Sequence, residues 1–179
     1  TEGLVGSEMC IRDSPWTLPA NLAIAVHPRE KYVQVMDGDI GYWVAEELSE
    51  SLSSNFDFKK PVFGKSKTGK EISGWKTQHP FIDRESPILT ADYVTMESGT
   101  GCVHIAPGHG LDDYLTGIEN GLEVYCPLTD YGTYVDDGMI PSALVGVSVL
   151  EKSTGCPAND SVLEILESKN ALLAKQSHH

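Results

Sequence analysis

The sequence predicts a mainly β fold of the α+β class, with a closed β-barrel core and helices at its periphery. Short apolar or alternating segments recur about eight times between turn signals, which is typical of small barrels. Few segments have the periodicity of an amphipathic helix. Strands and helices do not alternate in the way that a parallel sheet requires.

The first half of the chain is expected to hold a buried strand, two hairpins and one weak helix. The run 22–27 is apolar and precedes a proline, so we expect a buried strand there. Alternation in 32–36 ends at an Asp-Gly turn signal, which makes 40–44 its hairpin partner. The remaining elements are a weak helix over 45–53 and a second hairpin that joins strands 61–64 and 71–77 through a turn at Thr68-Gly69.

The second half is expected to hold three more strands and two helices. Strands 93–96 and 102–106 flank a glycine-rich turn, and a further strand covers 144–150. A short helix over 111–120 ends at a glycine, which readily takes the left-handed conformation found at helix ends. The residues Ser161 to Glu164 match a capping box, so we expect them to begin a last helix with one apolar face.

Composition limits the classes of function. The 179 residues suit a single domain spanning 1–179. Apolar residues make up 40% and charged residues 22% of the chain, which excludes a disordered tail. No apolar run is long enough to span a bilayer, which excludes a membrane-spanning protein, and we expect no membrane partner. The net charge of −13 gives an anionic partner no long-range attraction. The four cysteines form no CxxC pair and no dense disulfide framework, which favours a reducing, cytoplasmic compartment.

The two ends of the chain indicate a domain excised from a longer protein. Thr1 is not an initiator, and the first residues do not match a signal peptide. The last residues form no recognisable terminal element. We therefore expect a monomeric fragment of a larger chain.

A lysine-rich segment looks like a phosphate-binding loop but fails at a decisive position. Gly64 to Lys70 fits most of the pattern, yet Glu71 follows where Ser or Thr should hold magnesium. Six of the 13 basic residues fall between Lys59 and Lys76, opposed by one glutamate, so the local balance is +5. We interpret the segment as a solvated edge hairpin, in which lysines discourage strand pairing. A local phosphate contact is the alternative.

The first segment that carries chemistry runs from Ser14 to Asn21. Two prolines fix the backbone on either side of Trp16 and Thr17. The hydroxyls of Ser14 and Thr17 and the amide of Asn21 project from this loop, which offers hydrogen-bonding groups but no strong base. The alternative is a proline turn with Trp16 in the core and Asn21 capping backbone groups, and composition alone favours it.

The second such segment runs from Gly99 to Tyr114. Along its strand, alternation places His104 opposite the core-facing residues and between small neighbours, which suits a compact pocket. Asp113 falls in the first turn of the next helix, where the dipole favours an ionised carboxylate. Such a carboxylate beside a small pocket suits an α-ammonium group. The spacing of His104, His109 and Asp113 matches no metal-ligand signature, so no metal is expected.

Both segments closely resemble the editing domain of isoleucyl-tRNA synthetase, an insertion in the catalytic domain of a class I enzyme. The matching motifs are PWTLPANLAIAVHP and GTGCVHIAPGHGLDDY, in that order. The related valyl and leucyl enzymes usually carry Arg-Pro in the first motif and lack this histidine-bearing second motif. Segment 80–88 is also similar to the family, and the resemblance spans roughly residues 14–150. The barrel expected above is of this editing-domain type.

The resemblance implies post-transfer editing: hydrolysis of the ester of valine wrongly joined to tRNA(Ile), with valyl-adenylate as a further candidate substrate. A synthetic site cannot exclude a side chain one methylene too small, so a second site destroys the product. The implied partners are the 3′ end of that tRNA and the rest of the parent synthetase. The parent uses ATP and magnesium, while the editing domain needs no cofactor and should have no ligase activity by itself.

The same resemblance implies roles for individual residues. Asp113 matches the aspartate that holds the α-ammonium, and His104 matches the histidine whose bulk rejects isoleucine. A water near the ester carbonyl, oriented by hydroxyls, is the expected nucleophile. The implied catalytic residues are Asp113, His104, Ser14 and Thr17, and the implied substrate-binding residues are Asp113, His104, Trp16, Asn21 and Asp13.

One departure from the family lies in the first segment. Where the family usually has three threonines before Pro-Trp, this chain has Arg12, Asp13 and Ser14. Only Ser14 keeps a hydroxyl. The change motivates an alternative from another functional class: a binding module that holds aminoacylated tRNA 3′ ends with weak or no hydrolysis. A structural insert without activity is the third hypothesis.

Overall fold

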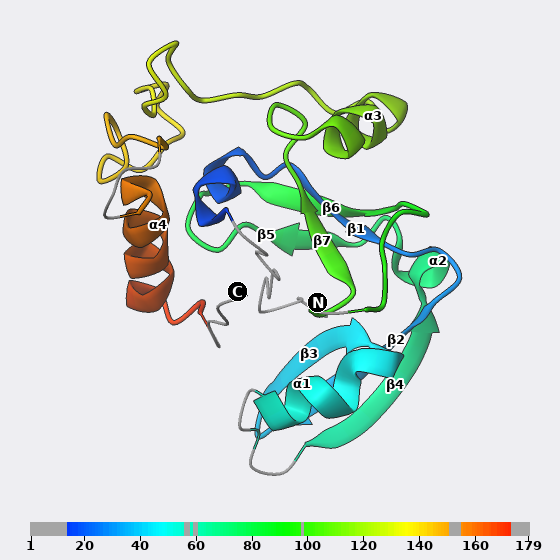
Figure 1. The fold of residues 1–179 in the computed structure, drawn as a ribbon. Coiled ribbons are helices and arrows are strands. Elements are labelled where there is room, and N and C mark those ends of the chain that lie inside the picture. The colour runs from blue at the N-terminus through cyan, green and yellow to red at the C-terminus, as the bar shows by residue number, and fades with distance from the viewer. Residues whose placement is uncertain (1–13, 56–57, 59–60, 98, 151–154, 173–179) are drawn as a thin grey trace.

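The computed structural model describes residues 14–55, 58, 61–97, 99–150 and 155–172, and its strands form two separate open sheets (Figure 1). The four-stranded sheet has the order β5-β6-β1-β7, and the three-stranded sheet has the order β3-β2-β4. Each sheet has two edge strands. The predicted mainly β fold with a closed barrel is therefore wrong, because the part of the chain that the structure describes is a mixed α/β fold with no closed barrel.

The four-stranded sheet carries the two motif segments. Its central strand β1 (Ala23–Val26) is buried throughout. On one side β1 pairs in parallel with β6 (Glu85–Thr90), and on the other it pairs antiparallel with β7 (Cys102–Ile105). The short strand β5 (Lys76–Gln78) is antiparallel to β6. The parallel pair is one reason why a barrel of consecutive antiparallel strands does not form: β6 reaches β1 only after a long excursion of the chain.

The three-stranded sheet occupies that excursion. Strands β2 (Lys31–Asp37) and β3 (Ile40–Ala45) form the predicted hairpin, with Asp37 paired to Ile40 and a left-handed Gly38 in the turn. Strand β4 (Val62–Thr68) pairs antiparallel with β2 and has mostly exposed side chains. Apolar side chains from β2 and β3 pack with the helix that follows them.

Short helices surround the sheets, as Figure 1 shows. The first, η1, is a 3₁₀ helix that leads into β1, and the orange helix α4 contacts it from the far end of the chain. None of the helices among the described residues is long and apolar enough to cross a membrane. The helices are η1 (Pro15–Ala20), η2 (Glu46–Leu48), α1 (Ser49–Asn55), α2 (Gly69–Ile72), α3 (Leu111–Glu119) and α4 (Pro157–Ser168).

The second predicted hairpin does not form. Strand β4 continues to Thr68, where α2 begins with a capping box: the Thr68 amide and hydroxyl both donate to Glu71 Oε2 at 2.7 Å. The residue that spoils the phosphate-loop pattern therefore caps a helix. The sequence Thr-x-x-Glu is itself a capping signal, and it competes here with the turn expected from Thr-Gly.

Two other predicted strands are absent from the described residues. Residues 93–96 are irregular, with a turn at Tyr93 and a bend at Met96. Residues 121–150 contain no strand, only isolated bridges at Leu128–Tyr134 and Thr133–Ser148. The last helix also begins earlier than expected, at Pro157 and not at Ser161. Proline suits the first helical position because its missing amide would have no partner there.

The lysine-rich segment lies along β4 and α2, and Lys59 and Lys60 fall outside the described residues. The Lys67 ammonium stands 5.7 Å from the centroid of the Trp75 ring. Lys76 on β5 forms an exposed ion pair with Glu85 at 2.6 Å. The segment is thus an exposed edge strand leading into a helix, not a hairpin.

Candidate functional site

The fold brings the two motif segments into direct contact. Thr17 Oγ1 on η1 lies 2.9 Å from His104 Nε2 on β7. The sheet explains this contact, because β1 follows η1 directly and pairs with β7, with Ile24 opposite His104. The Leu22 amide also donates to the Ile105 carbonyl at 2.9 Å. Segments 87 residues apart are therefore held in register by the central strand.

The hydrogen bonds of Thr17 fix the state of His104. The single hydroxyl proton of Thr17 is donated to the Ser14 carbonyl at 3.0 Å. His104 must then donate its Nε2 proton to Thr17, which leaves a lone pair on Nδ1. This buried Nδ1 has no hydrogen-bond partner among the described residues. Burial, with a smaller effect of His109, lowers the pKa of His104 to about 4, so the ring is neutral at neutral pH.

Trp16 faces the glycine-rich turn after β7. Its ring meets the His109 ring edge-on, with the centroids 4.9 Å apart. The tryptophan is half-buried and also packs against the apolar cluster of η1 and α4. Burial lowers the pKa of His109, which favours a neutral imidazole beside the indole. Trp16 thus forms a wall between the core and the turn.

Asp113 lies in the first helical turn of α3, the helix that follows the glycine-rich turn after β7. Its Oδ2 accepts a hydrogen bond from the Ala106 amide at 2.9 Å, which ties it to the end of β7. Burial raises the pKa of the carboxyl, and the Ala106 bond opposes this effect. No basic side chain of the described ranges forms an ion pair with it. A partly buried carboxylate without a counter-charge suits an ammonium group.

The remaining predicted site residues lie differently. Asn21 is 2% exposed, donates to the Ala23 carbonyl at 2.8 Å and accepts from the Ser86 hydroxyl at 2.7 Å. Its side chain therefore joins η1 to the neighbouring strands and lies in the core. The Ser14 carbonyl accepts from Thr17, and its side chain makes no helix-capping bond. Asp13 lies outside the described residues.

Sequence reasoning missed the side chains that hold η1 in place. Four of them, from segments far away in the sequence, bond to its backbone: His79, Arg84, Tyr134 and Asn159. Segment 80–88 was singled out by resemblance and contains Arg84, but no local pattern connects the others with η1. Their partners depend on the tertiary fold.

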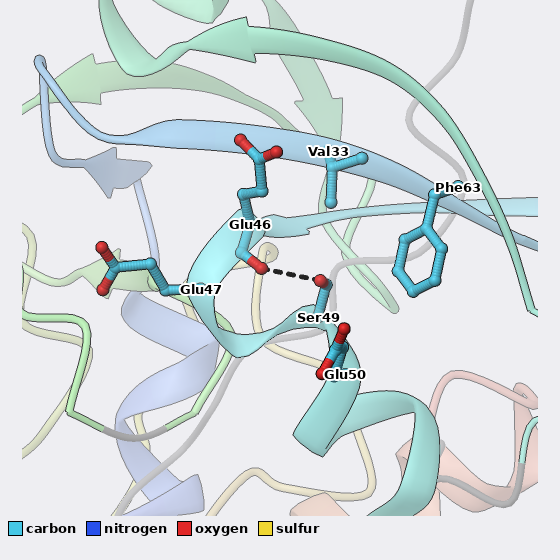
Figure 2. A pocket seen from close by; sticks show the side chains of 6 residues that line it. All are labelled: Val33, Glu46, Glu47, Ser49, Glu50 and Phe63. Carbon is cyan, nitrogen blue, oxygen red and sulfur yellow. Dashed lines mark hydrogen bonds between the residues drawn. The ribbon is translucent and has the colours of Figure 1, made fainter.

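A separate hollow lies beside the three-stranded sheet, and none of the predicted site residues lines it. Figure 2 shows three carboxylates around it, with Val33 and Phe63 on the strands. The Ser49 hydroxyl donates to the Glu46 carbonyl at 2.7 Å within the helical turn. Its acidic lining would repel the phosphates of a nucleic acid, so we do not place the function there. The lining residues are Val33, Glu46, Glu47, Ser49, Glu50 and Phe63.

The described residues contain no group of three or more His, Cys, Asp or Glu side chains that could hold a metal ion. Thr17 contacts the neutral His104, and Asp113 is bonded to Ala106 at the end of the same strand, so these three side chains are the candidate site. Its groups can bind an ammonium and accept a hydrogen bond, and none of them is an activated side-chain nucleophile.

Comparison with known sequences identifies relatives of this chain. A family model described as "Leucyl-tRNA synthetase, editing domain" matches residues 44–134. The isoleucine–tRNA ligase of Nitratidesulfovibrio vulgaris strain DP4 is 46% identical over 90% of this chain and 16% of the relative. That of a Synechococcus species is 43% identical over 92% of this chain and 17% of the relative. The chain thus spans about a sixth of the length of these relatives.

A solved structure shares the fold. The crystal structure of GlLeuRS-CP1 aligns with 87% of this chain and 66% of its own, with a TM-score of 0.54. Its sequence identity of 18% makes this a likeness of fold alone.

Proposed function

Because the chain belongs to the family of isoleucyl-tRNA synthetase editing domains, we propose that its site hydrolyses the ester of mischarged Val-tRNA(Ile). The role of such a domain is proofreading. The specific substrate rests on an argument about size: a synthetic site that accepts isoleucine cannot fully exclude the smaller valine. Valyl-adenylate presents the same amino-acid group and is the second substrate that we propose.

The observation that carries the proposal is that Asp113, a carboxylate without a counter-charge, is bonded to the end of the strand that carries the fixed, neutral His104. Asp113 would hold the α-ammonium of the aminoacyl group. His104 would wall the side-chain pocket, because the bond from its Nε2 to Thr17 prevents the ring from turning aside. A wall that admits valine and rejects isoleucine is the selectivity that a proofreading site needs.

The geometry also distributes the remaining roles. The Thr17 hydroxyl has its only proton committed to the Ser14 carbonyl, so we assign Thr17 to holding His104 and not to donating to the substrate. The Ser14 hydroxyl is then the candidate for orienting the attacking water. Asn21 would act from the core by fixing the end of η1, and Trp16 would shape the pocket. Asp13 stays a predicted substrate contact.

The reaction requires only water and a positioned ester. Water adds to the ester carbonyl carbon, the bond from that carbon to the ribose oxygen breaks, and a proton from the water passes to the departing ribose oxygen, which leaves as a hydroxyl. Oriented hydroxyls stabilise the charge that develops on the carbonyl oxygen. We assign no cofactor to this step, and we assign ATP and magnesium to the synthetic site of the parent enzyme.

The proposal extends to partners and location. The 3′ end of the tRNA would enter the site, while other domains of the parent synthetase bind the rest, because the net charge of −13 here opposes phosphates. We place the reaction in the cytoplasm, where aminoacylated tRNA is used. A chain acting alone would be a monomer.

The direct test is deacylation of Val-tRNA(Ile) by the purified chain. We expect release of valine at a rate far above that without protein, and little release of isoleucine from Ile-tRNA(Ile). Binding of a non-hydrolysable valyl-adenosine analogue, measured by calorimetry, is the companion experiment. Absence of both valine release and analogue binding would contradict the proposal.

A binding module without strong hydrolysis is the second candidate, favoured by Arg12, Asp13 and Ser14 where the family has threonines. Restoring three threonines should then raise the deacylation rate by about 10²–10³-fold without tightening analogue binding, since oriented hydroxyls act mainly in the transition state. An unchanged rate in the restored chain would mean either that Ser14 alone suffices or that these residues do not enter the site.

A further inference from the structure

We infer that four side chains far from η1 in the sequence are positioning residues of the editing site, an assignment that rests on the proposed function. They bond to the backbone of η1 and thereby set where Trp16 and Thr17 stand relative to β7. We call this set the η1 clamp. Its members are His79, Arg84, Tyr134 and Asn159.

The 3₁₀ helix η1 needs outside support because it has little of its own. It has six residues, two of which are prolines without an amide proton, and the side chain of its N-cap residue Ser14 makes no capping bond. The hydrogen-bond geometry of a 3₁₀ helix is poor, so runs longer than three or four residues are uncommon. Within η1, the Thr17 amide donates to Ser14 and the Asn21 amide to Leu18. Its placement must come from the tertiary structure.

One half of the clamp lies between β5 and β6. His79 Nδ1 accepts from the amides of Phe81 and Ile82 at 3.3 and 3.1 Å, so its proton sits on Nε2. That Nε2 lies 2.9 Å from the Leu18 carbonyl and donates to it. The ring is 4% exposed, and its bonds leave it one orientation.

Arg84 binds the next carbonyl along η1, that of Pro19. Its Nη2 donates to the Pro19 carbonyl at 2.7 Å, and its guanidinium lies 5.4 Å from the centroid of the Tyr125 ring. Its Nε and Nη1 are buried and have no hydrogen-bond partner within the described ranges. Unpaired buried donors are costly to stability. A positioning role for the site explains why such an arginine is tolerated.

The other half of the clamp holds the peptide groups of Trp16. Its amide donates to Asn159 Oδ1 on α4 at 3.0 Å, across 143 residues of sequence. Its carbonyl accepts from the hydroxyl of Tyr134, which is 2% exposed. Apolar side chains of η1, α4 and the Tyr134 segment also pack together. Trp16 is therefore fixed from both sides by segments that follow the second motif.

The clamp acts on the chemistry through one hydrogen bond. A shift of η1 would move Thr17 away from His104 and leave the imidazole free to turn. Displacements of about 1 Å in a catalytic group can cost about 10²-fold in rate. Loss of a clamp bond should therefore lower kcat strongly while it changes the urea midpoint only a little.

The test uses two deletions and two controls. Asn159→Ala and Tyr134→Phe each remove one bond to Trp16, while Asn159→Asp keeps an acceptor oxygen at the same position. Ser53→Ala removes the buried hydrogen bond from the Ser53 hydroxyl to the Ser49 carbonyl, 2.7 Å long, in α1 beside the three-stranded sheet. It controls for the loss of stability that follows from removing any buried hydrogen bond. For each chain, the deacylation of Val-tRNA(Ile), the affinity for a valyl-adenosine analogue and the urea midpoint are measured.

A spectroscopic readout reports the position of η1 without catalysis. The chain has three tryptophans, so 5-fluorotryptophan labelling should give three resonances, with that of Trp16 assigned by Trp16→Phe. The rings of Trp43 and Trp75 meet edge-on with centroids 5.4 Å apart, pack against the apolar cluster of the three-stranded sheet, and serve as internal references. In Asn159→Ala and Tyr134→Phe, only the Trp16 resonance should move.

The expected result is a fall in kcat of about 10–100-fold in the two deletions, with wild-type rates in Asn159→Asp and Ser53→Ala. Unchanged rates in the deletions overturn the inference, even if the Trp16 resonance moves, because the bonds would then be only structural. If the wild-type chain hydrolyses nothing, the proposed function fails separately. The clamp is then supported by a moved Trp16 resonance with weaker analogue binding, and overturned if both stay unchanged.

Discussion

The two sheets of this molecule differ in the polar groups buried beside them. The three-stranded sheet packs apolar side chains, its glutamates are exposed, and its buried Tyr32 hydroxyl both accepts and donates a hydrogen bond. Burial also raises the pKa of Tyr32, but that phenol is neutral at neutral pH in any case. Beside the four-stranded sheet, by contrast, burial acts on groups that are ordinarily charged or partly charged near neutral pH. It lowers the pKa values of His79, His104 and Arg84 and raises that of Asp113.

On the proposed function, the three-stranded sheet serves stability and the four-stranded sheet serves binding. Burying a charge without a partner is unfavourable, so a fold selected for stability alone would pair or expose these groups. Ionisable groups with shifted pKa values and open hydrogen-bonding positions gather where a ligand completes them. The predictions below would sharpen this contrast or break it.

The largest effect is expected from Asp113→Ala. Loss of the ammonium partner should weaken binding of a valyl-adenosine analogue by about 2–4 kcal/mol, because the interaction is charge-assisted and partly desolvated. Calorimetry measures it, together with deacylation of Val-tRNA(Ile). Asp112→Ala is the matched control, since that neighbouring carboxylate is exposed. Equal affinities in the two variants would remove Asp113 from the proposed site.

The ionised carboxylate of Asp113, which would bind the ammonium, should lower the stability of the folded chain. Burial raises the folded-state pKa of Asp113, so its ionised form disfavours the fold as pH rises. Asp113→Asn keeps an acceptor for the Ala106 amide without the charge. We therefore expect urea unfolding to show a more stable variant at neutral pH, with the gain shrinking on acidification. If Asp113→Asn were less stable than the wild type at neutral pH, the buried charge of Asp113 would not be a cost to the fold, and the contrast between the two sheets would fail.

Acidification should destabilise the fold through two buried histidines: His79 of the clamp and His104, the proposed wall of the side-chain pocket. Burial lowers the pKa of His79 and of His104 from 6.5 to about 4, so stability present at neutral pH is lost as pH falls through this range. His79, 4% exposed, should contribute roughly 2–3 kcal/mol of this loss. Urea unfolding between about pH 7 and 4 measures it. A pH slope unchanged by His79→Gln would argue against the buried neutral ring.

A change of selectivity is expected from His104→Ala. Removing the imidazole leaves a pocket larger by more than a methylene, so Ile-tRNA(Ile) should become a substrate, with a gain of roughly 10–100-fold in its deacylation. The measurement compares release of isoleucine and of valine by the two chains. Continued sparing of Ile-tRNA(Ile), with valine release intact, would show that His104 is not the steric gate.

The sequence predicted those parts of the molecule that local patterns determine. The hairpin of β2 and β3 follows from an Asp-Gly turn between alternating segments, and β1, β7 and α3 follow from apolar runs and glycines. The sheet assignment failed because local patterns do not show which strands pair. Nothing near residues 23–26 indicates that their parallel partner begins at Glu85.

The candidate site shows the same division. The motifs that contain Thr17, His104 and Asp113 are visible in the sequence, and the contact of Thr17 with His104 follows from pairing of β1 with β7. Asn21 looked like a substrate ligand because it lies in a matching motif, yet its side chain is in the core. Tyr134 and Asn159 could not be found, since their bonds to Trp16 exist only when distant segments meet.

The smallest effect is expected from Glu47→Gln, in the hollow beside the three-stranded sheet. Glu47 is exposed and lies near Glu46 and Glu50, so removing its charge relieves a weak repulsion in water. The free energy of unfolding should change by less than about 0.5 kcal/mol. Deacylation of Val-tRNA(Ile) should keep the wild-type kcat and KM, because the hollow shares no residue with the candidate site. A lower KM would instead mean that this acidic surface repels the bound tRNA. The three-stranded sheet would then take part in substrate binding, and its contrast with the four-stranded sheet would fail.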